Sequence, residues 1–116
     1  MPSFSQGDIV RVPFPYTDRA TRESRPALVV SVGEMTLVRG LLWVTMITSA
    51  ANRGWDGDLE ITNLTLAGLP AASAIRPAKI ATIEAVDASS LGRISAALLR
   101  KVLARLATEI GIDATG

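Results

Sequence analysis

The feature that most constrains the fold is a change in hydrophobic spacing near residue 95. Before that point, apolar residues form short runs or alternate with polar ones, and Pro, Gly and Asn interrupt them. After it, apolar residues recur every three or four positions, which is typical of one face of an amphipathic helix. Several short strands separated by turns favour a small barrel. We therefore expect a mainly β fold that ends in a C-terminal helix.

The expected strands differ in how completely they are buried. The runs 26–32 and 41–47 are almost continuously apolar, which predicts two buried strands. They are joined through Gly33 and an Arg39-Gly40 turn, so we interpret them as a central hairpin. Segment 16–24 is polar and should be an exposed loop. The remaining strands are expected at 8–14, 59–64, 73–76 and 79–86.

The C-terminal helix has recognisable ends. Ser95 is a suitable N-cap, and Gly111 is a suitable residue just after the last turn. The chain has 116 residues, which is enough for one hydrophobic core. We expect a single domain over residues 1–112 and a loose tail over 113–116. The apolar stripe of the helix is wide, so part of it could form a dimer surface, and it contains Leu98, Leu99, Val102, Leu103, Leu106 and Ile110.

Composition excludes several classes of chemistry. The chain contains no cysteine and no histidine, which excludes disulfide scaffolds, thiolate or imidazole metal ligands, and nucleophilic triads that depend on either residue. The acidic residues form no ligand cluster in the sequence, so we expect no metal site and no cofactor. The net charge is only +1, so any nucleic-acid site must be a local patch and not a property of the whole surface.

The compartment is suggested by what the sequence lacks. Residues 1–8 do not have the basic and then apolar layout of a signal peptide. No apolar run reaches the length that spans a membrane. Absence of cysteine also fits a reducing compartment. We expect a cytoplasmic protein that does not enter a membrane.

Two polar positions stand where buried strands begin or end. Arg25 precedes Pro26, which restricts the Arg25 backbone to extended conformations at the start of its strand. Thr48 and Ser49 follow the next strand, so an antiparallel hairpin would bring Arg25 and Thr48 to the same end, where they could bind a phosphate. Ordinary roles stay open for each: a solvated or ion-paired arginine, and hydroxyls that cap turn backbone.

Three longer runs carry a family resemblance. They are GDIVRVPFPYTD at 7–18, SRPALVVS at 24–31 and ITS at 47–49. Their residues, order and spacing closely resemble the PemK/MazF family of toxin endoribonucleases. Further matches extend the resemblance from about residue 7 to residue 111, and they are Gly68-Leu69-Pro70, Ser73, Lys79 to Ile83, and Gly92-Arg93-Ile94.

The resemblance implies a fold, an activity and partners. It implies a small SH3-like barrel, a homodimer, and cleavage of single-stranded RNA, in particular messenger RNA. It also implies control by a cognate antitoxin, whose acidic segment competes with RNA for the groove formed by the two subunits. Family enzymes use no metal: the RNA 2′-hydroxyl attacks the neighbouring phosphate and leaves a 2′,3′-cyclic phosphate and a free 5′-hydroxyl.

The resemblance also assigns residues. It implies that Arg25 and Thr48 carry catalysis. An arginine stays protonated, so it suits the charge that accumulates on phosphate oxygens and is a poor general base. Thr48 would donate a hydrogen bond and orient the phosphate. The proton acceptor for the 2′-hydroxyl stays open; Asp18 and Glu23 are the nearby carboxylates. The further candidates for RNA binding are Arg22, Ser49, Arg53, Ser73, Arg76 and Lys79.

Two positions depart from the family pattern, and two other readings remain. Ser24 and Ala81 stand where family members often have basic residues. Both departures remove positive charge, which other arginines or lysines could replace. The chain could instead be a non-catalytic toxin of the same fold that poisons a DNA topoisomerase. It could also be an inactive RNA-binding regulator. Cleavage of RNA by the pure protein decides against the topoisomerase poison, and RNA binding without strand scission would reveal the regulator.

Overall fold

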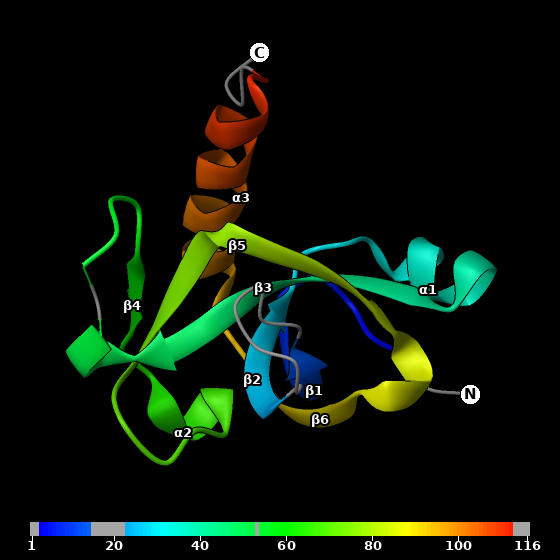
Figure 1. The fold of residues 1–116 in the computed structure, drawn as a ribbon, viewed down its shortest axis with the longest axis horizontal. Coiled ribbons are helices and arrows are strands. Elements are labelled where there is room, and N and C mark those ends of the chain that lie inside the picture. Colours follow the sequence, from blue (N-terminus) through cyan, green and yellow to red (C-terminus); the bar gives the residue numbers. More distant parts are fainter. Residues whose placement is uncertain (1–2, 15–22, 53, 113–116) are drawn as a thin grey trace.

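The computed structural model describes residues 3–14, 23–52 and 54–112. Six strands form one antiparallel sheet in the order β4-β5-β3-β2-β1-β6, which curls into a half-barrel beside the C-terminal helix α3 (Figure 1). The expected mainly β fold with a C-terminal helix is confirmed. The strands are β1 Asp8–Phe14, β2 Glu23–Val29, β3 Leu41–Ser49, β4 Leu59–Ile61, β5 Ser73–Glu84 and β6 Ser89–Arg93, and the helices are α1 Gly33–Arg39, α2 Leu64–Ala67 and α3 Ala96–Ile110, with single 3₁₀ turns η1 Ala50–Asn52 and η2 Ala85–Asp87.

The sheet buries side chains on both faces. Successive residues of a strand point to opposite faces, and β3 shows this directly, since Val44 and Met46 belong to one buried cluster and Ile47 to the other. The first cluster fills the inside of the curl with residues of β1, β2, β3 and β5. The second contains Val102 and Leu106 of α3, so the helix covers the opposite face. The continuous apolar runs of β2 and β3 follow from this double burial.

β5 is one strand where the sequence predicted two. It pairs with β3 over residues 73–76 and 80–84, and the register shifts between Thr45, which lies opposite Ile80, and Met46, which lies opposite Arg76. The extra residues of β5 form a bulge that contains Pro77. Proline has no backbone N–H, and at this position none is needed for a hydrogen bond between the strands. The proline therefore bends the strand without ending it, and the expected break at 77 was wrong.

Three short elements were not predicted. Helix α1 interrupts the connection of the expected β2–β3 hairpin, although the two strands do pair. Helix α2 begins at Asn63, whose side chain accepts the Leu66 N–H, so the expected strand at 59–64 ends early, at Ile61. β6 pairs with β1 and passes so close to α2 that a Cβ on Gly92 would lie 2.4 Å from the Ala67 carbonyl carbon.

Helix α3 has the ends that the sequence predicts. The Ser95 side chain accepts the Leu98 N–H at 3.2 Å, and Gly111 closes the helix with a left-handed φ of 91°. The predicted tail at 113–116 lies outside the described residues, as does most of the predicted loop at 16–24, whose last residues already belong to β2. Within the described ranges, no helix is long and apolar enough to cross a membrane.

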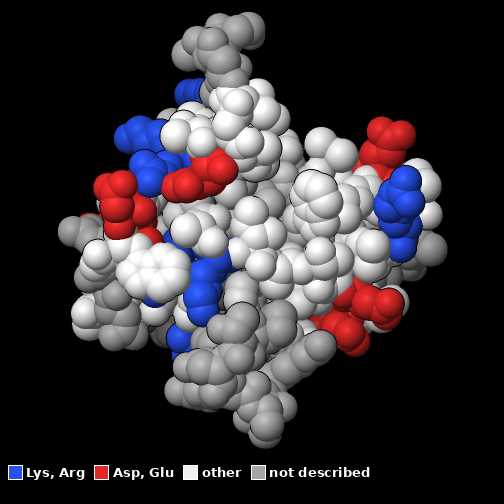
Figure 2. All heavy atoms as spheres, turned by 45° about the horizontal axis from the view of Figure 1, so that its top comes forward, with Lys and Arg blue, Asp and Glu red and all other residues white. Residues whose placement is uncertain are grey.

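An apolar groove of about 510 Å³ runs between α3 and the sheet. Trp43 and Ile80 on the sheet side are about half exposed there, and Ile110 on the helix side is 65% exposed. Figure 2 shows charged side chains at two sides of one face of the molecule and an uncharged surface between them. The groove is lined by Val30, Trp43, Ile80, Thr82, Leu103, Leu106, Ala107, Ile110 and Ile112.

Candidate active site

A second hollow, of about 260 Å³, lies at the ends of β2 and β3. We call it the rim pocket. It brings together two predicted catalytic residues, Arg25 and Thr48, and two predicted RNA contacts, Ser49 and Ser73. The expected placement of Arg25 and Thr48 at one end of paired strands is therefore correct. The full lining is Arg11, Arg25, Pro26, Ile47, Thr48, Ser49 and Leu69 to Ser73.

Arg25 enters the rim pocket from β2. Its backbone lies opposite Val12 of β1, and the β2–β3 pairing begins two residues later, at Ala27 opposite Met46. Its Nε atom is buried and makes no hydrogen bond within the described part of the chain. A buried donor without an acceptor is unfavourable. Arg25 therefore brings a guanidinium group with an unsatisfied Nε to the lining of the pocket.

Thr48 lies near the end of β3 and is only 4% exposed. It pairs with Ala74 of β5, and Met46 pairs with Arg76. Side chains of directly opposite residues share a face of the sheet, so Thr48 projects from the face that carries Met46 and the inner buried cluster. A β-branched residue suits this strand position, and its hydroxyl supplies a neutral donor beside the arginine.

The two serines of the rim pocket both bond to nearby backbone. The Ser49 Oγ accepts the Ala51 N–H at 3.3 Å, and the Ser73 Oγ donates to the Ala71 carbonyl at 2.9 Å. These are the turn-capping roles that were the alternative to RNA contact. Each hydroxyl still has hydrogen-bonding capacity left over, so the capping roles and contact with a ligand are compatible.

Arg11 is the lining residue that the sequence analysis missed. It lies opposite Pro26 in the β1–β2 ladder, and its side chain is exposed. The signal was present, because Val10 and Val12 alternate with it and point into the core. An antiparallel β1–β2 register then brings Arg11 beside the Arg25-Pro26 step. The residues that line the rim pocket therefore include two arginines and three residues with a hydroxyl group.

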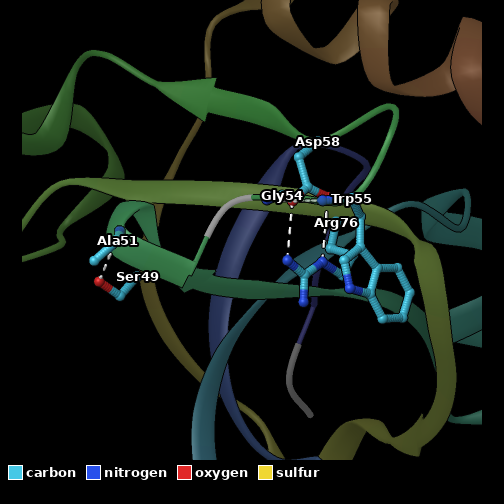
Figure 3. A network of polar contacts seen from close by, with 6 residues as sticks. All are labelled: Ser49, Ala51, Gly54, Trp55, Asp58 and Arg76. Atoms are coloured by element: carbon cyan, nitrogen blue, oxygen red, sulfur yellow. Dashed lines mark hydrogen bonds and ion pairs between the residues drawn. The ribbon is translucent and has the colours of Figure 1, made fainter.

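Arg76 does not line the rim pocket. Instead it forms a buried ion pair with Asp58: its Nε lies 3.2 Å from Oδ1 and its Nη2 lies 3.0 Å from Oδ2 (Figure 3). The side chains are 9% and 2% exposed, so Arg76, a candidate for RNA binding, is a buried and ion-paired residue and not a surface charge. Its guanidinium carbon also lies 4.3 Å from the centroid of the Trp55 ring.

Asp58 is the centre of this arrangement. Besides Arg76, its Oδ2 accepts the backbone N–H groups of Gly54 and Trp55, each at 3.4 Å (Figure 3). Burial opposes ionisation of the carboxyl, but the hydrogen bonds from Arg76 and the two N–H groups outweigh it and lower the pKa of Asp58 below its ordinary 3.8. We call Trp55, Asp58 and Arg76 the tryptophan clamp.

The other candidate residues have different positions. Lys79 lies in the β5 bulge, with Nζ at 5.9 Å from the Trp55 centroid. Arg22 and Arg53 lie outside the described residues. Ser24 is exposed, whereas Ala81 packs in the inner cluster, so its identity follows from packing. Across residues 3–14, 23–52 and 54–112, no three acidic side chains gather as a metal site.

Comparisons with known proteins identify a family and a fold. Residues 5–110 match the family described as PemK-like, MazF-like toxin of type II toxin-antitoxin system. MazF from Deinococcus radiodurans is similar in structure, with a TM-score of 0.79 and 23% identity over 97% of this chain and 100% of that one. A chain of the MazE–MazF complex from the same organism has a TM-score of 0.77 and 22% sequence identity, again over 97% of this chain and 100% of that one. An endoribonuclease in complex with its cognate antitoxin, from a mycobacterial species, has a TM-score of 0.73 and 18% sequence identity over 97% of each chain. No curated protein matches the sequence significantly.

Proposed function

Because the chain belongs to the PemK-like, MazF-like toxin family of type II toxin–antitoxin systems, we propose that it is a toxin that cleaves single-stranded RNA. The observation that carries this proposal is the buried, unpartnered Nε of Arg25 in a pocket that also holds Thr48. A donor pair of this kind fits the oxygens of a phosphodiester. Arginine in particular suits the planar, two-pronged recognition of phosphate.

The reaction that fits these groups is an internal transesterification. The 2′-oxygen of a ribose forms a bond to the adjacent phosphorus and loses its proton, while the bond from phosphorus to the 5′-oxygen breaks and that oxygen gains a proton. The products are a 2′,3′-cyclic phosphate and a 5′-hydroxyl. Charge on the non-bridging oxygens rises in the transition state, so Arg25 stabilises that state more than the substrate. Thr48 donates a hydrogen bond that orients the same phosphate.

The chain's own residues suffice for this stabilisation without a metal ion. The lining residues Arg11 and Arg25 supply positive charge, and Thr48 and Ser49 supply neutral donors. The Ser73 hydroxyl already donates its hydrogen to the Ala71 carbonyl. RNA provides the nucleophile itself, so no protein nucleophile is required. We therefore propose a metal-independent endoribonuclease that acts on messenger RNA, with Ser49 and Ser73 as further RNA contacts and with Arg22, Arg53 and Lys79 contributing positive charge along the strand.

The proposed partners are a second copy of the chain and a cognate antitoxin. The groove between α3 and the sheet exposes Trp43, Ile80 and Ile110 together, and an apolar surface of this kind marks an interaction site. We propose that it is the homodimer interface. An antitoxin with an acidic segment would compete for the arginines of the rim pocket, so it would bind faster at low salt. We also propose that the toxin acts in the cytoplasm, where messenger RNA is found.

The test uses the purified full-length protein and a long single-stranded RNA. We expect cleavage that persists in excess EDTA and leaves ends with a cyclic phosphate and a 5′-hydroxyl, identified by end sequencing and enzymatic end-labelling. Arg25→Lys should lose most of the activity while it stays folded, because an ammonium cannot make the same two-pronged contact. Arg39→Lys is the matched control, since Arg39 is exposed on α1. Intact RNA with the parent protein, or normal cleavage by Arg25→Lys, would contradict the proposal.

A further inference from the structure

The turn that follows η1 carries an indole outside the rim pocket. Trp55 keeps 47% of its surface exposed and belongs to neither buried cluster. Single exposed apolar residues are common and need no special explanation, so exposure alone does not indicate a site. What distinguishes Trp55 is the way in which its ring is held.

The tryptophan clamp fixes the ring from two directions. The Arg76 guanidinium lies 4.3 Å from the ring centroid, and the Trp55 backbone N–H reaches the carboxylate that holds Arg76 in place. Asp58 and Arg76 are themselves buried. The ring therefore has a set position before any ligand arrives, and a ligand that stacks on it does not have to order it.

The clamp lies on the same face of the sheet as Thr48. Arg76 is opposite Met46, and Thr48 is opposite Ala74, two residues further along the same pair of strands. Diagonal neighbours of this kind are about 7–8 Å apart and share a face. Thr48, one of the two catalytic candidates, is therefore a diagonal neighbour of Arg76, the residue that supports the Trp55 ring.

We propose that Trp55 is a stacking platform for a nucleobase of the RNA, next to the phosphate that is cleaved. The inference rests on the proposed ribonuclease function and adds a binding residue to it. Proteins hold single strands by stacking unpaired bases on aromatic rings and by placing cations along the backbone. The clamp supplies the first element, and Lys79, with Nζ at 5.9 Å from the ring centroid, supplies positive charge beside it.

The first arm of the test is a comparison of protein variants with base-deleted RNA. The substrate is an RNA whose cleavage site has been mapped with the parent protein, prepared with one abasic nucleotide at each position flanking that site. We expect Trp55→Ala to raise KM for the intact RNA by about 5- to 150-fold, the range for loss of one stacked base. At one flanking position, removal of the base should raise KM for the parent protein. For Trp55→Ala, the same abasic RNA should have the KM of the intact RNA, because the stacking contact is already absent. Trp55→Phe keeps a ring and should recover part of the affinity.

The second arm measures binding without cleavage, so it separates this inference from the proposed function. The probe is a pool of mixed-sequence 2′-O-methyl oligonucleotides, which lack the nucleophile, followed by fluorescence anisotropy. Val86→Ala is the control, because Val86 is 74% exposed on η2 and belongs to no proposed site. Weaker binding by Trp55→Ala, with unchanged thermal stability and a control equal to the parent, supports the platform.

Three results would overturn the platform, and a fourth would separate it from the ribonuclease function. One is equal affinity of parent and Trp55→Ala for the pool. Another is an additive loss at every abasic position, which would show that no flanking base depends on the Trp55 ring. If the parent binds the pool through Trp55 but cleaves no RNA, base stacking on Trp55 stands, and the ribonuclease function fails together with the placement beside a cleaved phosphate. If the parent neither binds nor cleaves, both fail.

Discussion

The ion pair between Asp58 and Arg76 gives the clearest quantitative prediction about stability. Asp58→Ala removes the carboxylate from a site where the side chain is 2% exposed and leaves the Arg76 guanidinium buried without its counter-charge. Breaking a buried pair in this way costs about 3–5 kcal/mol. For a chain of 116 residues, each kcal/mol lowers Tm by about 4 °C. We expect Tm to fall by about 12–20 °C.

Calorimetry of three variants tests this reasoning. Asp58→Ala combined with Arg76→Met removes both charges and should recover much of the loss, because the orphaned cation is the main cause of the destabilisation. Glu109→Ala breaks the exposed pair with Arg105 instead and should leave Tm nearly unchanged. A fall in Tm for Asp58→Ala no larger than that for Glu109→Ala would refute the argument, as would a double variant less stable than the single one.

The same pair predicts a dependence on pH with a definite sign. The pKa of Asp58 is lowered in the folded state from its ordinary 3.8, so the unfolded chain binds the proton more readily. The stabilisation is therefore complete above the ordinary value and is lost as the pH falls through the folded pKa. The difference in Tm between the parent and Asp58→Ala should shrink as the pH is lowered from about 5 toward 2. A difference that stays constant over this range would contradict the linkage.

Four further predictions concern other parts of the molecule. Gly92→Ala forces a Cβ to within 2.4 Å of the Ala67 carbonyl carbon and should lower the free energy of unfolding, measured in urea, by about 1–3 kcal/mol. A variant as stable as the parent would mean that β6 and α2 are not so close. Thr48→Val should slow cleavage up to about 10-fold with little change in Tm; a parental rate would make Thr48 structural. Ile110→Lys should give monomers in light scattering, and a persistent dimer would place the interface elsewhere. None of the described lining residues of the rim pocket is a carboxylate, so removal of the 2′-hydroxyl proton falls to solvent hydroxide and the cleavage rate should rise steadily from pH 6 to 8. A plateau within this range would reveal a titrating protein base.

Elements with a strong local signal were predictable from the sequence. The period of α3, its cap at Ser95 and its glycine at 111 all lie within the helix or next to it. The apolar runs of β2 and β3 predict two adjacent buried strands, and their antiparallel pairing is enough to bring Arg25 and Thr48 together. The part of the rim pocket that follows from one hairpin was therefore within reach of sequence reasoning.

Elements that depend on distant partners were not predictable. β6 contains two serines and a glycine, which have low strand propensity, and it is a strand because β1 offers it a ladder. Helix α1 leaves Leu37 and Val38 exposed, so it shows no amphipathic pattern. The tryptophan clamp joins Asp58 to Arg76 across 18 residues. Nothing local to Arg76 distinguishes it from a surface arginine, and its burial follows only from the β3–β5 register.

The contrast between Arg25 and Arg76 shows how the same residue type serves two purposes on one sheet. Arg76 is held by a carboxylate in a bidentate pair, so its charge is already balanced and it can support a neighbouring ring. Arg25 has a buried Nε, and no acidic side chain pairs with it in the described part of the chain. An orphaned donor at this depth is unfavourable in the free protein and is relieved when an anion binds. None of the described residues that line the site is a carboxylate, so the site favours anionic ligands. A phosphodiester and the acidic segment of the proposed antitoxin share that charge, and we expect them to compete for Arg25.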